Sequence, residues 1–210
     1  MNGGQPTRFI TLLVTSALLS GCSGIERLDF TSWGRAFWQR PDDVIRSLEI
    51  PPGAKVADLG SGEGYFVPYL SRAVGERGRV YAVEVDAKLA QALQRRFDGM
   101  KNIAVVLGTP EDSGLPDGQI DLVLIVDTYH HVENRVFYFR RLLADLAPGA
   151  RVAVIEPNAD LTGILSLFVR KDHSSRAADI EREMRAAGYR RLKGIDKLPV
   201  QLFEIYGRTG

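Results

Sequence analysis

The sequence predicts a doubly wound α/β domain, a mostly parallel seven-stranded sheet with helices on both faces. Short apolar runs alternate with segments of helical periodicity along most of the chain, and this alternation is typical of layered α/β folds. The run 120–126 is apolar at every position except Asp121, as expected of a parallel strand buried on both faces. A glycine-rich loop follows the first predicted strand, and such folds bind ligands at the carboxyl ends of their strands.

The predicted elements follow one another at regular intervals. The first helix, 41–48, begins with Pro41 and carries Asp42 and Asp43 in its first turn, where acidic side chains favour the positive end of the helix dipole. The last helix is expected to have Ser174 as its cap and Gly188 just past its end. Strands are predicted at 55–59, 79–85, 103–107, 120–126, 151–155, 189–193 and 201–206, and the other helices at 66–74, 87–97, 135–146 and 174–187.

The stretch 56–66 (VADLGSGEGYF) places three glycines on alternate positions directly after a strand. Glycine has no Cβ and tolerates positive φ, so the backbone of such a loop can lie against a ligand. Gly64 comes two residues after Gly62, one fewer than in the dinucleotide fingerprint GxGxxG. The second strand carries Glu84, 20 positions after Gly64. That separation puts a carboxylate at the tip of the neighbouring strand, where it can accept both hydroxyls of a ribose.

The D-x-G-x-G-x-G loop at 58–64 and the acid of the second strand together resemble the class I S-adenosylmethionine-dependent methyltransferases, of the type 11 kind. The resemblance covers about residues 38–206. It implies a Rossmann-like methyltransferase fold, S-adenosylmethionine as the cofactor, and transfer of its methyl group to a small-molecule acceptor. The sulfonium leaving group is already activated, so the protein mainly has to hold the acceptor atom and the methyl carbon in line.

The same resemblance implies roles for individual residues. The glycine loop would pass the methionine and ribose portions, Asp58 would help to hold the amino group, and Glu84 would hold the ribose hydroxyls. Asp127, or its carbonyl, would also meet the amino group. The implied cofactor-binding residues are Asp58, Gly60, Ser61, Gly62, Gly64, Glu84, Glu111, Asp112 and Asp127.

The segment 108–121 resembles the family's connection between the third and fourth strands. In many relatives an aspartate after the first glycine reaches the adenine amino group, but Thr109 stands at that position here. A hydroxyl can accept a hydrogen bond, and Glu111 or Asp112 are the alternatives for this contact.

The stretch 127–131 (DTYHH) follows the fourth strand, on the rim where cofactor and acceptor are expected to meet. Tyr129 and His130 are predicted as catalytic residues on the acceptor side, because such groups can orient an acceptor or take its proton. For His130 a capping or packing role is an equal alternative, and for His131 packing is favoured. No metal site is predicted, since the only other histidine is His173 and no ligand spacing recurs.

The N-terminus predicts a separate property. Residues 9–19 form an apolar run after Arg8, too short to span a bilayer, which needs about 20 apolar residues, but with the proportions of a signal-peptide core. The run ends in Leu-Ser-Gly-Cys22, which resembles the bacterial lipobox. Residues 1–21 are therefore predicted as a lipoprotein signal peptide, Cys22 as the lipidated residue, 22–40 as a tether and 41–210 as the methyltransferase-like domain. The alternative is an uncleaved apolar N-terminus with an inert Cys22, the only cysteine of the chain.

The composition of the chain limits the classes of partner that it is expected to bind. The net charge is +1 for 210 residues, which argues against a nucleic-acid binder, since those usually carry a basic face. The expected partners are a small-molecule acceptor and, through the lipid anchor, a membrane. The expected location is the bacterial cell envelope, or the cytoplasm if the leader reflects a misassigned start.

Three functions stay open at this point. The chain is an active methyltransferase, a membrane-tethered module that binds a nucleoside-like ligand without chemistry, or an interaction module that keeps only the fold. Fold alone does not choose among them. Asp58, the glycine loop and Glu84 are all in place, and this favours the first two.

Overall fold

The computed structural model describes residues 32–162, 167 and 169–209. The predicted signal peptide and Cys22 lie outside these residues. Residues Trp38–Gly210 form one compact unit. In chain order the elements, with η for 3-10 helices, are α2 (Ser32–Gln39), α3 (Pro41–Leu48), β1 (Lys55–Leu59), α4 (Val67–Val74), β2 (Arg79–Glu84), α5 (Ala87–Arg96), β3 (Ile103–Leu107), β4 (Ile120–Val126), η1 (Tyr129–His131), α6 (Arg135–Leu142), β5 (Leu146–Pro157), η3 (Lys171–His173), α7 (Ala177–Ala187), β6 (Tyr189–Gly194) and β7 (Gln201–Arg208).

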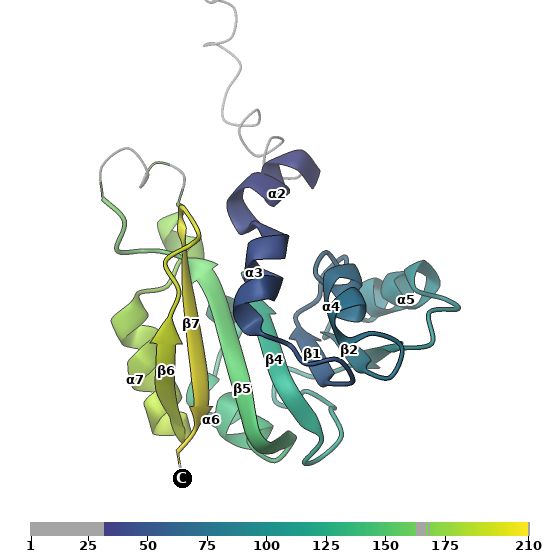
Figure 1. Ribbon diagram of the computed structural model, residues 1–210. Coiled ribbons are helices and arrows are strands. Elements are labelled where there is room, and N and C mark those ends of the chain that lie inside the picture. Colours follow the sequence, from purple (N-terminus) through teal and green to yellow (C-terminus); the bar gives the residue numbers. More distant parts are fainter. Residues whose placement is uncertain (1–31, 163–166, 168, 210) are drawn as a thin grey trace, which may run out of the picture. The chain divides into compact units, whose positions relative to one another are not determined.

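The seven strands form one sheet in the order β3-β2-β1-β4-β5-β7-β6 (Figure 1). Strands β1 to β5 pair in parallel, and β7 runs antiparallel to both β5 and β6. The order reverses between β1 and β4, so the predicted doubly wound, mostly parallel sheet is confirmed. Because parallel strands end at the same edge of a sheet, the carboxyl ends of β2, β1 and β4 lie side by side at this switch point.

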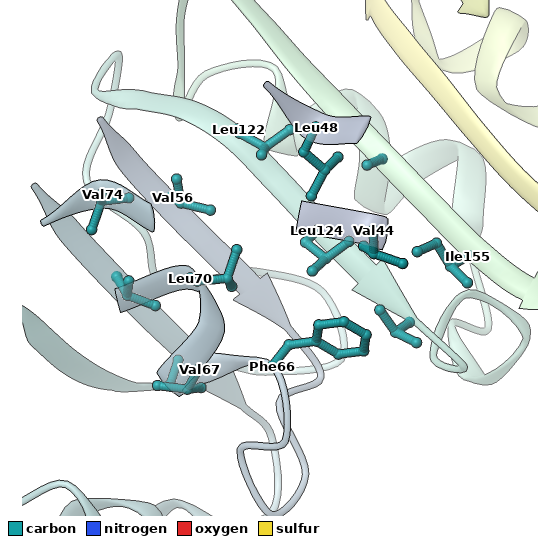
Figure 2. Packing of buried hydrophobic residues seen from close by; sticks show 14 of the residues in the cluster. Val44, Leu48, Val56, Phe66, Val67, Leu70, Val74, Leu122, Leu124 and Ile155 are labelled. Atoms are coloured by element: carbon teal, nitrogen blue, oxygen red, sulfur yellow. The ribbon is translucent and has the colours of Figure 1, made fainter. Parts of the chain in front are cut away.

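Helices cover both faces of the sheet. On one face α3, α4 and α5 pack on the strands, and on the other α6 and α7 do. Figure 2 shows the first face, where Leu48 of α3 and Leu70 of α4 point toward the sheet. Leu122 and Leu124 of β4 belong to this face, while the alternating Val123 and Ile125 belong to the other. This double burial explains why β4 is a continuous apolar run rather than an alternating one.

The predicted element types are confirmed from residue 41 onward, but several boundaries differ. Helix α6 ends at Leu142, because β5 already begins at Leu146 and is longer than predicted. Residues 32–39, predicted as part of a tether, form α2. Among the described residues, no helix has both the length and the apolar character to cross a bilayer.

The predicted cap at Ser174 is wrong. Helix α7 begins at Ala177, and its N-cap residue, Arg176, makes no side-chain cap. The chain before it is held elsewhere, because Ser175 N donates to Pro157 O and Ser175 O accepts from Ala159 N, both at 3.0 Å. The predicted stop at Gly188 is confirmed by its φ of +102°, a left-handed C-cap.

The core assignment predicts a stability difference between two leucines. Leu70 is fully buried, whereas Leu107 on β3 is 57% exposed. We expect Leu70→Ala to lower the free energy of unfolding by about 2–5 kcal/mol, because the cavity adds to the lost transfer energy. The control Leu107→Ala should change it by no more than about 0.5 kcal/mol. Urea denaturation followed by circular dichroism measures both, and equal effects would contradict the assigned core.

Candidate functional site

The site begins in the loop between β1 and α4. The amides of Gly60 and Ser61 both donate to Val83 O at 2.9 Å, so the loop is tied to the end of β2. Gly64 N donates to Ser61 O at 2.8 Å and closes a turn. Gly60, Gly62 and Gly64 have φ of +73°, +55° and +77°, in the left-handed region that glycine adopts without steric cost.

The three glycines serve different purposes. A Cβ on Gly60 would lie 2.3 Å from the Thr128 side chain, and one on Gly64 would lie 2.7 Å from the Phe97 ring. These two glycines therefore allow close packing within the protein. A Cβ on Gly62 would meet nothing within 4 Å. Gly62 thus faces open space, where its backbone is accessible to a ligand.

Glu84 stands beside this open position. Its side chain is buried, and its Oε2 accepts from Gly62 N at 2.8 Å. Its Oε1 accepts from Val85 N at 2.8 Å and from Asp86 N at 3.1 Å. A carboxylate has about four acceptor positions, of which three amides use three. One acceptor position is therefore left, and a ribose held through both hydroxyls would also need the position that Gly62 N now uses.

Two further carboxylates lie at the ends of neighbouring strands. Asp58, in β1, is buried. Asp127 follows β4 with a φ of +50°, a conformation that aspartate tolerates better than most residues. Its carboxylate accepts from Gln39 Nε2 and from Gln201 Nε2, each at 2.7 Å. With Glu84, the ends of β2, β1 and β4 thus carry three acids, a set of hydrogen-bond acceptors suited to a ligand with positive charge and hydroxyl groups.

Tyr129, predicted on the acceptor side, is a packing residue in the structure. It is 1% exposed, its hydroxyl donates to Glu183 Oε2 at 2.8 Å, and its ring stacks on Phe139 with centroids 5.2 Å apart. Burial and the Glu183 carboxylate raise the pKa of Tyr129 far above its ordinary value. A buried phenol that donates to a carboxylate is poorly suited to take a proton from an acceptor. Its place between the sheet and helices α6 and α7 therefore corrects the prediction.

His130 is held by a buried acid, Glu156, that no sequence motif singled out. Its Nδ1 lies 2.6 Å from Glu156 Oε2. Glu156 is fully buried in β5, and its Oε1 accepts from Tyr129 N at 2.7 Å. The carboxylate favours the tautomer with a proton on Nδ1 and leaves Nε2 with its lone pair. An acid near the carboxyl end of a strand, the signal that identified Glu84, would have identified Glu156 as well.

The structure also gathers the histidines. His130 Nε2 lies 3.2 Å from His173 Nδ1, across 43 positions of sequence. The ring of His131 lies 4.0 Å from that of His130 and 5.7 Å from that of His173, between centroids. Burial, and then the two neighbouring histidines, lower the pKa of His131. Sequence spacing does not reveal this cluster, because η3 comes from a distant segment.

The loop after β3 contains the two acids proposed for the adenine contact. Asp112 accepts from Gly114 N at 3.0 Å and forms an ion pair with Arg141 of α6. The Gly114 amide and then Arg141 hold the pKa of Asp112 below its ordinary value. These partners commit Asp112 to the α6 side and argue against the predicted adenine contact. Glu111 is exposed, and its adenine contact stays a prediction.

Three comparisons bear on this geometry. Residues 57–154 match a family model described as a methyltransferase domain. The ubiquinone/menaquinone biosynthesis C-methyltransferase UbiE of Shewanella pealeana is 30% identical over 132 residues, which cover 61% of this chain and 52% of that protein. A 37.1 kDa protein in transposon TN4556 of Streptomyces fradiae is 27% identical over 145 residues, covering 69% of this chain and 41% of that protein. The chain thus spans about half the length of the curated relatives it matches.

The fold has a solved counterpart. A SAM dependent methyltransferase from Aquifex aeolicus aligns with a TM-score of 0.75 at 24% identity, covering 87% of this chain and 95% of the other. Fold and site together define an α/β protein that binds its ligand at the switch point of the sheet. More particularly, residues 57–154 match the methyltransferase domain family, and the fold is that of the solved SAM dependent methyltransferase.

The residues at the switch point fit S-adenosylmethionine, the cofactor that the sequence resemblance implies. Glu84 stands where a ribose diol needs an acceptor, and the open side of Gly62 leaves room for the ligand. Gln201 Oε1 is buried with no hydrogen-bond partner among the described residues. It lies on the side chain that also donates to Asp127. An acceptor and a carboxylate side by side suit the ammonium group of a methionine.

The carboxylate of Glu84 provides a direct test of the cofactor site. Glu84→Ala should weaken binding of S-adenosylhomocysteine by about 1–3 kcal/mol, because two ribose hydroxyls lose their acceptor. The exposed neighbour Glu63→Ala is the matched control, since it lies in the same loop. Isothermal titration calorimetry measures both variants. Unchanged affinity in Glu84→Ala would remove this residue from the site.

Proposed function

We propose that this chain is an S-adenosylmethionine-dependent enzyme that methylates a small-molecule acceptor. The observation that carries the proposal is the open backbone at Gly62 next to the buried Glu84 carboxylate. Packing explains Gly60 and Gly64, whereas Gly62 has a φ of +55° and open space on the side where a Cβ would lie, so its backbone stays accessible beside Glu84. The matched methyltransferase domain and the relatives named as methyltransferases support the same assignment.

The bound cofactor would supply an activated methyl group on a cationic sulfur. The residues of the chain then have three tasks. Glu84 and the loop at Gly62 hold the ribose, and Asp58, Asp127 and the Gln201 amide oxygen hold the amino end. Holding both ends fixes the direction in which the methyl group points, and alignment of the reacting atoms can remove about 7–11 kcal/mol of the barrier to such a displacement.

We assign the acceptor side to His130. Thr128, two residues before it, packs against Gly60, so η1 borders the cofactor loop. The side chain of His130 is 10% exposed and is fixed by Glu156. A fixed, partly accessible imidazole can orient an acceptor. The relatives named ubiquinone/menaquinone C-methyltransferases make quinol-type phenols the first acceptors to test.

Turnover separates an enzyme from a binding module. The purified chain, given S-adenosylmethionine and a panel of phenolic and quinol acceptors, should release S-adenosylhomocysteine, detected by mass spectrometry. His130→Ala should lower the rate about 100-fold, because the acceptor is misplaced, and it should leave cofactor affinity unchanged. Cofactor binding without turnover on the panel or on small-molecule extracts would favour the alternative, a module that holds a nucleoside-like ligand.

We also propose that the chain is a lipoprotein of the bacterial envelope, anchored to a membrane through Cys22. The support is in the sequence, where an apolar run of signal-peptide length ends in Leu-Ser-Gly-Cys22. Acyl chains contribute about 0.8 kcal/mol for each buried CH₂, so two or more chains give stable attachment.

Substitution of the cysteine tests the anchor. Cys22→Ser should prevent lipidation and move the protein out of the membrane fraction or leave it as an unprocessed precursor. The readouts are flotation of membranes and the intact mass of the protein. A lipid-free native chain of unprocessed mass would exclude the lipoprotein and favour a cytoplasmic enzyme.

A further inference from the structure

All the histidines of the chain lie in one place. The sequence has three, His130, His131 and His173. In the structure each offers a ring nitrogen, and these three nitrogens lie within 4.8 Å of one another. Two come from η1, after β4, and the third from η3, before α7. Neither the cofactor site nor the hydrophobic core requires this grouping.

We propose that His130, His131 and His173 form a binding site for one divalent transition-metal ion, with Zn²⁺ as the reference ion. Two nitrogens that share a tetrahedral Zn²⁺, each about 2.0–2.1 Å from it, lie roughly 3.3 Å apart. His130 Nε2 and His173 Nδ1 are 3.2 Å apart. This pair already has the separation that two zinc ligands need. The third nitrogen lies within 4.8 Å of the others, so it has to approach by at most about 1.5 Å.

A buried carboxylate orients one of the three rings, and a surface carboxylate lies near a second. Glu156 Oε2 accepts from His130 Nδ1, which leaves Nε2 for the ion. On the other side, the exposed Asp172 Oδ2 lies 3.5 Å from His173 Nε2, longer than an ordinary hydrogen bond, while His173 Nδ1 faces His130 Nε2. Metal-ligating histidines commonly donate their second ring N–H to a carboxylate, as His130 does to Glu156. Glu156 is fully buried, so the orientation of His130 is fixed by the protein interior.

Hydrogen bonding alone explains only part of the arrangement. An N–H···N bond between His130 and His173 accounts for their 3.2 Å separation. It does not account for His131, whose ring lies 4.0 Å from that of His130, between centroids. A shared ion would give His131 a role in the cluster beyond these ring contacts.

The donor set and its exposure indicate which ion and which kind of site. Imidazole suits zinc, copper and nickel, whereas magnesium and calcium prefer oxygen. His131 is exposed and the side chain of His173 is 45% exposed, so a fourth position faces solvent. Three protein ligands with one open position are the arrangement of catalytic zinc sites rather than structural ones. With the ion bound, His130 would act on an acceptor through the metal.

Metal binding is tested without any methyl transfer. The full chain, purified without a histidine tag and stripped with a chelator, is titrated with Zn²⁺ in competition with a chromogenic zinc indicator. We expect one zinc per chain. Loss of an outer-shell partner weakens metal binding about 10–100-fold, and loss of a ligand should cost at least as much. His173→Ala and His131→Ala should therefore each weaken zinc binding to that extent or more. Glu133→Gln, an exposed acid two positions from His131, is the matched control and should bind as the native chain does.

A spectroscopic measurement identifies the zinc ligands directly. X-ray absorption at the zinc edge should show nitrogen or oxygen neighbours at about 2.0–2.1 Å, with the imidazole pattern reduced in His173→Ala. Circular dichroism confirms that each variant is folded. No zinc bound at micromolar concentration, or equal affinity in the native chain and both histidine variants, would overturn the proposal. Neither result would touch the methyltransferase proposal, which is tested by cofactor binding and turnover.

Discussion

One carbonyl oxygen organises the cofactor side of this protein. Val83 O accepts from both Gly60 N and Ser61 N, and in doing so ties the loop after β1 to the end of β2. The tie is possible because β1 and β2 are parallel with Leu59 opposite Val83, so the two strands end together. Once the loop is tied, Gly62 N reaches the Glu84 carboxylate. The relation between loop and acid is therefore set by strand register and does not depend on a ligand.

The features that depend on interactions between residues close in sequence could be predicted from the sequence. Helix and strand types, the apolar run of β4, the glycine loop and the acid at Glu84 follow from periodicity and spacing of about twenty residues or fewer. The direction of a side chain was harder to predict. Tyr129 and His130 are adjacent in sequence. Tyr129 packs between the sheet and helices α6 and α7, whereas His130 contacts Glu156. The pattern DTYHH is the same for either arrangement.

Contacts between distant segments account for the remaining differences. Asp127 receives one amide from Gln39, in α2, and another from Gln201, at the start of β7. Strand β7 is antiparallel to β5, and Gln201 pairs with Pro157, so its first residue arrives at the edge where the parallel strands end. His173 reaches His130 by a similar long connection. No spacing rule along one chain encodes such meetings, since each needs the completed sheet.

The gathering of every imidazole into one cluster also has a spectroscopic consequence. In most proteins histidine signals come from scattered positions and must be assigned before they inform on any site. Here each histidine ring resonance in a nuclear magnetic resonance spectrum originates within one small region, next to a loop that packs on Gly60. At constant pH, selective isotope labelling of histidine would therefore place every labelled ring signal at the rim of the sheet, where ligand binding could be followed without assignment of distant residues.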